Sequence, residues 1–132
     1  MTNQKTAFFI DDDPDFLDTL SMALRHPLFK IETYCAQNGY RAVDEILRVK
    51  PDVIFIDFYL PRANGGQVIP IVQSVNGLRK IPVYFLTAYS KDAVGAFLNH
   101  LEFGGILEKD QHFIEEIVKI LDQLAGTALQ GR

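Results

Sequence analysis

The chain is poor in cysteine, lacks long apolar runs and carries no excess of positive charge. Cys35 is the single cysteine among 132 residues, so an internal disulfide is excluded and a reducing, cytoplasmic compartment is expected. The N-terminal residues include no apolar stretch of signal-peptide length, and no segment is long enough to span a membrane. The formal net charge of −4 argues against direct binding to nucleic acid, and no polybasic run suggests a membrane anchor.

The rest of the composition is that of an ordinary folded domain. Hydrophobic residues make up 48% of the chain and charged residues 23%, which provides enough apolar surface to bury a core. No repeat, low-complexity segment or linker rich in Gly, Pro or Ser divides the chain, whose length fits one domain. We therefore expect a single domain over residues 1–132, with a frayed tail at residues 127–132.

Short apolar runs alternate along the chain with amphipathic segments of helical spacing. Strands are expected at residues 6–10, 30–34, 52–57, 82–87 and 104–109, and helices at residues 14–26, 38–50, 66–77, 91–101 and 110–126. Asp13 is the expected N-cap of the first helix, and Pro14 is its expected first residue. Pro70 is expected in a first turn or at a kink, and Gly95 weakens its helix. Fivefold alternation of strand and helix predicts an α/β fold with a parallel sheet covered on both faces.

Residues that can carry chemistry stand at the ends of four expected strands. They are Asp11, Asp12 and Asp13 after the first strand, Asp57 at the end of the third, Thr87 at the end of the fourth and Lys109 at the end of the fifth. The carboxyl ends of parallel strands lie on one edge of a sheet, and ligands of such folds bind there. We therefore expect these side chains to form one site.

Crowded carboxylates with no arginine nearby in sequence call for a positive partner. Oxygen ligands of this type suit Mg²⁺ or Mn²⁺. A carboxylate can also accept a phosphoryl group, and Asp57 is the candidate nucleophile. The metal and Lys109 would neutralise the phosphoryl oxygens, and the Thr87 hydroxyl could donate a hydrogen bond to one of them. Structural interpretations remain: a capping turn for the acids, a strand-end hydroxyl for Thr87 and a surface charge for Lys109.

The segments "FFIDDDP", "DVIFIDFYLPRANGG", "VYFLTA" and "GGILEK", in this order, resemble the receiver domains of two-component response regulators. The resemblance covers about residues 5–125. It implies a flavodoxin-like (βα)5 fold with a five-stranded parallel sheet of strand order 2-1-3-4-5. It also implies that the domain phosphorylates and dephosphorylates itself as a phosphoacceptor and is not a turnover enzyme.

The resemblance assigns roles to single residues. It makes Asp57 the phosphoacceptor, with Thr87 contacting the phosphoryl group and Lys109 pairing with it. It makes Asp12 a direct metal ligand and Asp11 a ligand through water. Asp57 and the backbone carbonyl of Tyr59 complete the implied metal ligands.

Five positions depart from the family pattern. Leu60 replaces the usual Met before the proline that follows the acceptor. Ile106 stands where the family has a Tyr or Phe whose ring rotates on activation, so ring rotation cannot carry the signal. Asp110 replaces the proline that usually follows the lysine, which leaves both a trans and a cis bond open. Tyr59 and Tyr89 stand where side chains influence phosphoryl lifetime, and we expect slow dephosphorylation.

Two functions compete on this sequence. The first is a stand-alone switch, phosphorylated by a histidine kinase or a histidine phosphotransfer protein and acting through a downstream protein partner or a self-dimer. The second is a phosphorylation-independent pseudo-receiver that serves as a constitutive protein-interaction module. Ile106 and the missing Lys-Pro pair favour the second, and the complete set of acids with Thr87 and Lys109 favours the first. A flavodoxin would need a phosphate-cradling loop in place of the three acids, and an aspartate phosphatase usually has a second Asp at the position of Tyr59.

Overall fold

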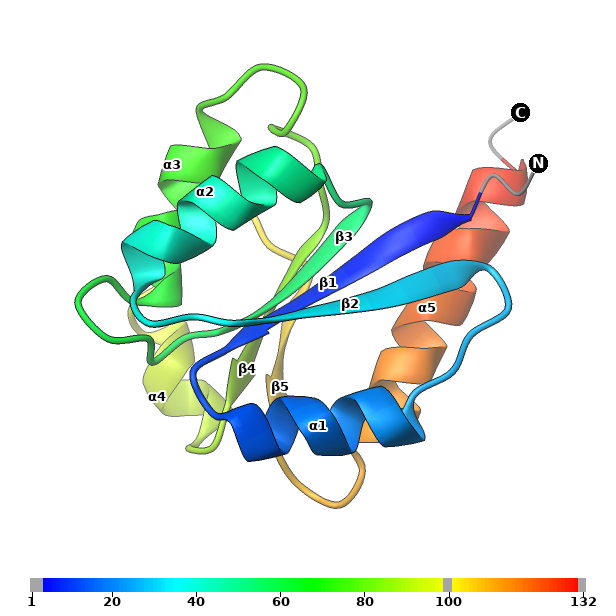
Figure 1. Cartoon of the computed structure of the whole chain (residues 1–132), viewed down its shortest axis with the longest axis horizontal. Helices are drawn as coiled ribbons and strands as arrows, with labels where there is room; N and C mark the ends of the chain where they lie inside the picture. Colours follow the sequence, from blue (N-terminus) through cyan, green and yellow to red (C-terminus); the bar gives the residue numbers. More distant parts are fainter. Residues whose placement is uncertain (1–3, 99–100, 131–132) are drawn as a thin grey trace.

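A computed structural model describes residues 4–98 and 101–130 as three layers, with a five-stranded parallel sheet between two layers of helices (Figure 1). The strand order is β2-β1-β3-β4-β5, which confirms the expected topology. The strands are β1 (Lys5–Asp11), β2 (Phe29–Cys35), β3 (Val53–Asp57), β4 (Val83–Thr87) and β5 (Gly105–Glu108). The helices are α1 (Pro14–Ala23), α2 (Gly39–Val49), α3 (Gly65–Gln73), α4 (Lys91–Gly95) and α5 (Phe113–Gln130).

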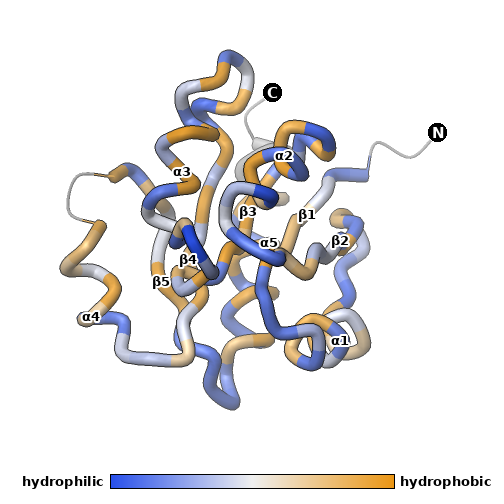
Figure 2. The backbone as a smooth tube through the Cα atoms, turned by 60° about the vertical axis from the view of Figure 1, so that its left-hand side comes forward, coloured by the Kyte–Doolittle hydropathy of each residue, from blue (hydrophilic) through white to orange (hydrophobic). Residues whose placement is uncertain are grey.

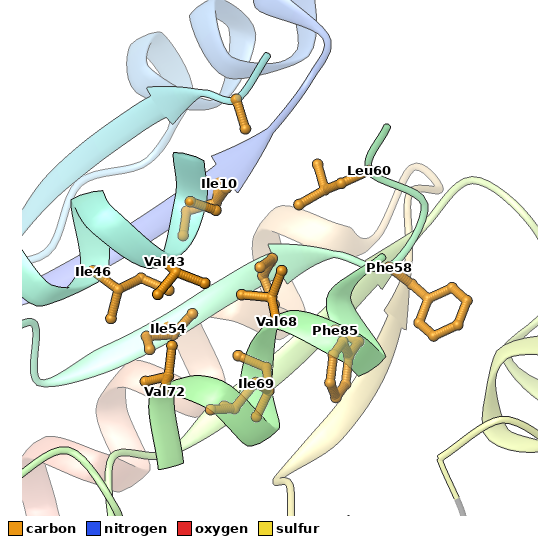
Figure 3. Packing of buried hydrophobic residues seen from close by; sticks show 14 of the residues in the cluster. Ile10, Val43, Ile46, Ile54, Phe58, Leu60, Val68, Ile69, Val72 and Phe85 are labelled. Atoms are coloured by element: carbon orange, nitrogen blue, oxygen red, sulfur yellow. The ribbon is translucent and has the colours of Figure 1, made fainter. Parts of the chain in front are cut away.

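Two apolar clusters lie on opposite faces of the sheet, because successive strand residues point to opposite sides. Phe8 and Ile10 of β1 pack with α2, α3 and α4, and part of this cluster is shown in Figure 3. Phe9 of the same strand packs with α1 and α5, where its ring stacks on Phe55 at 4.5 Å. Figure 2 shows helices with both hydrophobic and hydrophilic segments, as expected for elements with one face on the sheet.

The first and last helices, α1 and α5, differ in their bounds from the expected ranges. Helix α1 stops at Ala23, three residues early, because Leu24 is extended (φ −94°, ψ 123°). Helix α5 begins at Phe113 rather than at residue 110, since the Asp110 carboxylate accepts a hydrogen bond from the His112 amide in the preceding turn. It continues to Gln130, so residues 127–130 are helical rather than frayed, and residues 131–132 lie outside the described part. No described helix has the length and hydropathy that crossing a bilayer requires.

Helices α3 and α4 are shorter than their sequence patterns indicate. Asn64 and Gln67 form a capping box that begins α3, and Pro70 lies in the second turn, not the first. The helix ends at Gln73, three residues after the proline, which cannot donate a hydrogen bond to the preceding turn. Helix α4 was expected over residues 91–101 and ends at Gly95, a poor helix former; residues 99–100 of that range lie outside the described residues.

Candidate functional site

Three carboxylates gather where β1 and β3 end side by side. Asp11, Asp12 and Asp57 each offer an oxygen within 4.8 Å of the others, and Asp11 and Asp57 are buried while Asp12 is exposed. The parallel pairing of Ile10 with Ile56 causes this convergence, because the next residue of each strand is an aspartate. Asp11 also accepts a hydrogen bond from the Asp13 amide at 2.9 Å, so the turn after β1 orients its carboxylate.

Lys109 reaches this acidic group from the end of β5. Its Nζ lies 2.5 Å from Asp11 Oδ2 and 2.7 Å from Asp57 Oδ2, and its side chain is largely buried. The Lys109 amide donates to the Thr87 carbonyl at 2.7 Å, which extends the β4–β5 pairing to the lysine. Among the described residues every peptide bond is trans, so the Lys109–Asp110 bond is trans as well.

Thr87 and Asp57 are each held by the backbone that follows them. The Thr87 side chain is buried, and its Oγ1 accepts a hydrogen bond from the Tyr89 amide at 2.9 Å. Asp57 Oδ1 accepts a hydrogen bond from the Tyr59 amide at 2.8 Å in the same manner. The Thr87 hydroxyl keeps its own hydrogen for donation to a ligand oxygen. Two adjacent strand ends therefore present a carboxylate and a hydroxyl in fixed orientations.

The electrostatics of the site are those of an acidic pair with one counter-ion. Burial and the charge of Asp57 raise the pKa of Asp11, and the nearby ammonium group of Lys109 opposes this rise. Partial burial and the charge of Asp11 raise the pKa of Asp12. Burial alone would lower the pKa of Lys109, but its contacts with Asp11 and Asp57 outweigh this and raise it. The lysine is therefore charged at neutral pH, and the acids are short of positive charge.

The donor set fits a divalent cation. Asp11 Oδ2 is a buried oxygen without a well-directed hydrogen bond, because its contact with Lys109 Nζ is an ion pair only. The carboxylate oxygens of Asp11, Asp12 and Asp57 are hard ligands of the type that Mg²⁺ prefers. The Tyr59 carbonyl as a further ligand stays a prediction. A groove that is open to solvent lies beside the exposed Asp12 and is lined by Asp12, Tyr59, Leu60, Pro61, Arg62, Asn64 and Gln67.

Aromatic side chains line the rim of the site between β3 and α4. The Tyr59 and Tyr89 rings meet edge to face with centroids 5.1 Å apart, and both are exposed. The buried Phe58 ring contacts the Tyr59 ring, with centroids 4.9 Å apart, and the ring of Phe97, which is 65% exposed. The sequence placed Tyr59 and Tyr89 near the site, but it did not show that the two rings touch.

Ile106, the residue at the family's aromatic position, is half-buried and packs against the α2–α3–α4 cluster. Its Cδ1 lies 3.7 Å from the position that a Cβ on Gly95 would take, so it sits under the end of α4. One further contact was not foreseen. The Glu108 carboxylate accepts a hydrogen bond from the Lys91 amide at 2.8 Å and ties the start of α4 to β5.

These features, a parallel sheet of order 2-1-3-4-5 with buried aspartates and a lysine at one edge, agree with a family comparison. The family model described as "Response regulator receiver domain" matches residues 7–122. The chain belongs to the response regulator receiver family. Among the curated relatives of this receiver domain is the "Probable transcriptional regulatory protein TcrX" of Mycobacterium tuberculosis, 37% identical over 114 residues. That match covers 86% of the chain but 46% of the relative, so the chain spans less than half of the relative's length.

Solved receiver domains share the fold at lower identity. The receiver domain of the sensor histidine kinase PA1611 from Pseudomonas aeruginosa, whose structure has a magnesium ion coordinated in the active-site cleft, matches with a TM-score of 0.78 and 20% identity. The match covers 93% of this chain and 98% of that one. The receiver domain of the response regulator NarL from M. tuberculosis matches with a TM-score of 0.72 and 24% identity, over 93% and 98% of the two chains. These likenesses establish the fold.

Proposed function

We propose that this receiver domain accepts a phosphoryl group on Asp57 in a reaction that depends on Mg²⁺ or Mn²⁺. The observation that carries the proposal is the joint placement of Asp57, its two acidic neighbours and Lys109, with Lys109 Nζ 2.7 Å from Asp57 Oδ2. Both carboxylates that contact the lysine are buried. Burying charged groups costs stability, so their presence here favours a functional role. A second acidic residue beside a nucleophile makes sense where a cation is shared with phosphoryl oxygens.

The roles of the side chains follow from their positions. An Asp57 carboxylate oxygen attacks phosphorus, a P–O bond to Asp57 forms, and the bond between phosphorus and the donor's leaving atom breaks. The Lys109 ammonium, already beside Asp57, pairs with the developing charge, and the Thr87 hydroxyl donates to a phosphoryl oxygen. When bound by Asp11, Asp12 and Asp57, a divalent cation would neutralise charge on the phosphoryl oxygens. The domain is thus proposed as a phosphoacceptor rather than a turnover enzyme.

We propose a histidine kinase or a histidine phosphotransfer protein as the phosphoryl donor, and a cytoplasmic location. The phosphoryl group adds negative charge next to Thr87, whose Oγ1 is bonded to the Tyr89 amide at the start of the β4–α4 connection. A movement of Thr87 toward that group would break this bond and shift the loop. We propose that a protein partner or a second copy of the domain binds the shifted loop.

Intact-mass spectrometry after treatment with acetyl phosphate tests the proposal. With Mg²⁺ we expect a gain of one phosphoryl group, and none with a chelator or in Asp57→Asn. Asp52→Asn, at the opposite end of β3, is the matched control and should still gain the group. A folded protein that gains nothing with Mg²⁺ present would overturn the proposal and favour the constitutive interaction module that Ile106 also allows.

A further inference from the structure

Phe16, in the first turn of α1, places its ring against the amine of the site. The Lys109 Nζ lies 4.4 Å from the centroid of this ring. This distance is within the range of cation–π attraction between an ammonium group and an aromatic face. Among the described residues, Phe16 is the ring over which this ammonium lies.

The local sequence explains why the ring points there. Asp13 caps α1 and Pro14 begins it, so Phe16 is the third residue of the helix. Side chains of a helix lean toward its N-terminus, and the N-terminus of α1 adjoins the carboxyl end of β1, where the acids gather. The Phe16 ring also contacts the ring of Phe113 at the start of α5, with centroids 5.2 Å apart. The ring is therefore held between two helices and over the lysine.

The ring takes a place that water would otherwise fill. An ammonium group has three N–H donors, and Asp11 and Asp57 attract two of them. With only 14% of the Lys109 side chain exposed, little solvent reaches the remaining side. On that side the aromatic face of Phe16 attracts the Lys109 ammonium, and the ring neither accepts a proton nor binds a metal. If a divalent cation draws on the two carboxylates, their hold on the ammonium weakens, whereas the hold of the ring does not.

We propose that Phe16 is a positioning residue, whose ring face keeps the Lys109 ammonium beside the Asp57 carboxylate; its kinetic consequence rests on the phosphoacceptor function proposed above. Phe16 acts through Lys109 and touches neither the phosphoryl group nor the metal. Its aromatic character, rather than its bulk, is the property that matters. A leucine at this position fills similar space but has no aromatic face, and a tyrosine keeps the face.

The test combines a spectroscopic and a kinetic measurement on three variants, Phe16→Leu, Phe16→Tyr and Phe113→Leu. Phe113→Leu is the matched control because Phe113 packs on Phe16 but not on the ammonium. In protein labelled with ¹³C-lysine, the ring current of Phe16 should shift the Lys109 ε-methylene proton signals upfield. We expect Phe16→Leu to lose this shift and Phe16→Tyr to keep it. Phosphorylation by acetyl phosphate should slow roughly three- to tenfold in Phe16→Leu and within about twofold in the other two variants.

The outcomes separate the inference from the proposed function. If Phe16→Leu keeps the Lys109 shift, or phosphorylates as fast as the parent while folded, the positioning role is wrong. Equal slowing in Phe113→Leu, or slowing in Phe16→Tyr to the rate of Phe16→Leu, would reduce Phe16 to a packing residue and overturn the role as well. If the parent chain takes no phosphoryl group, the proposed function fails, and the ring-current measurement alone decides whether Phe16 holds the ammonium.

Discussion

The ends of β1 and β3 and the neighbouring ends of β4 and β5 are built in different ways. At β1 and β3, Asp11 and Asp57 are buried, and Lys109 bridges them at 2.5 and 2.7 Å. Beyond β4, helix α4 has five residues, of which Val94 is the buried one, and the Phe97 ring that follows is 65% exposed. The first region is ordered by charge pairs, and the second by the few apolar side chains, among them Val94 and Leu98, that reach the core cluster.

The difference teaches that the proposed phosphoacceptor residues and the element that would report on them need not change together. The residue types that the proposed phosphoryl transfer requires are present, while Ile106 stands where the resemblance to receiver domains led us to expect an aromatic residue. An isoleucine has no polar end that prefers solvent, so burial favours one state of its side chain. If the domain signals as proposed, we expect the change to pass through Thr87 and the α4 backbone, whose start the Glu108 carboxylate ties to β5.

Removing the lysine should break the first region most strongly. Lys109→Ala leaves Asp11 and Asp57 buried without a counter-ion, and we expect a loss of about 2–4 kcal/mol in the free energy of unfolding without metal. Added Mg²⁺ should recover part of this loss. Urea unfolding measures both effects, with the exposed Lys91→Ala as control. A loss equal to that of the control would show that the ion pair does not stabilise the region.

The two tyrosines on the rim connect the two regions. Their rings are 5.1 Å apart beside Asp57 and Thr87, so together they should hinder water from reaching a phosphoryl group on Asp57. We expect Tyr59→Ala and Tyr89→Ala each to shorten the phosphoryl half-life roughly two- to tenfold. Mass spectrometry after removal of the donor gives the half-life, and Tyr40→Ala, an exposed tyrosine on α2, is the control. Half-lives of seconds in the parent, unchanged in both variants, would refute the expectation.

Neutralising one acid should stabilise the metal-free protein. Because the folded-state pKa of Asp11 is raised, the protonated form favours the fold, and this contribution is lost as pH rises through the raised pKa. Asp11→Asn should therefore raise the Tm at pH 7 by about 4 °C without metal and remove the stabilisation that Mg²⁺ gives. The advantage should shrink as pH falls toward the ordinary value of 3.8. Thermal scans at several pH values test this, with Asp44→Asn as control; an advantage that grows in acid contradicts the sign.

The smallest effect is expected in α4. A Cβ on Gly95 would meet Ile106 Cδ1 at 3.7 Å, an ordinary contact, so Gly95→Ala should gain about 0.5 kcal/mol through helix propensity. Gly104→Ala is the contrasting variant, because its Cβ would approach the Tyr84 ring to 2.5 Å. Chemical denaturation of both variants compares them. A loss in Gly95→Ala equal to that in Gly104→Ala would mean that α4 is packed as tightly as the β4–β5 edge.

The sequence predicted the architecture well because apolar runs and turn residues report local structure directly. Each strand lies within about a residue or two of its expected range, and the resemblance supplied the strand order that the structure confirms. The short α4 was missed because the apolar spacing continues past Gly95, through Phe97 and Leu98, where the helix has ended. Apolar spacing reports which residues face the core and does not require a helix between them.

The site shows the same limit. Strand ends brought Asp11, Asp12 and Asp57 together because pairing of parallel strands fixes such positions. The contact between Phe16 and Lys109 joins residues far apart in sequence through side-chain direction, which no local pattern reports. The position of Phe16 in the first helical turn after the aspartates was the one sequence signal that could have placed its ring near the site. The metal-binding and phosphoacceptor roles stay predictions.

Hydrogen exchange before and after phosphorylation tests most directly whether the intact chemistry drives the altered readout. The chain would be treated with acetyl phosphate and Mg²⁺, with Asp57→Asn as control, and the backbone amides of residues 87–98 compared. The account predicts that exchange in this segment changes once Asp57 carries the phosphoryl group and stays the same in Asp57→Asn. A fully phosphorylated protein with unchanged exchange in residues 87–98 would contradict it and leave a domain that accepts the group without responding.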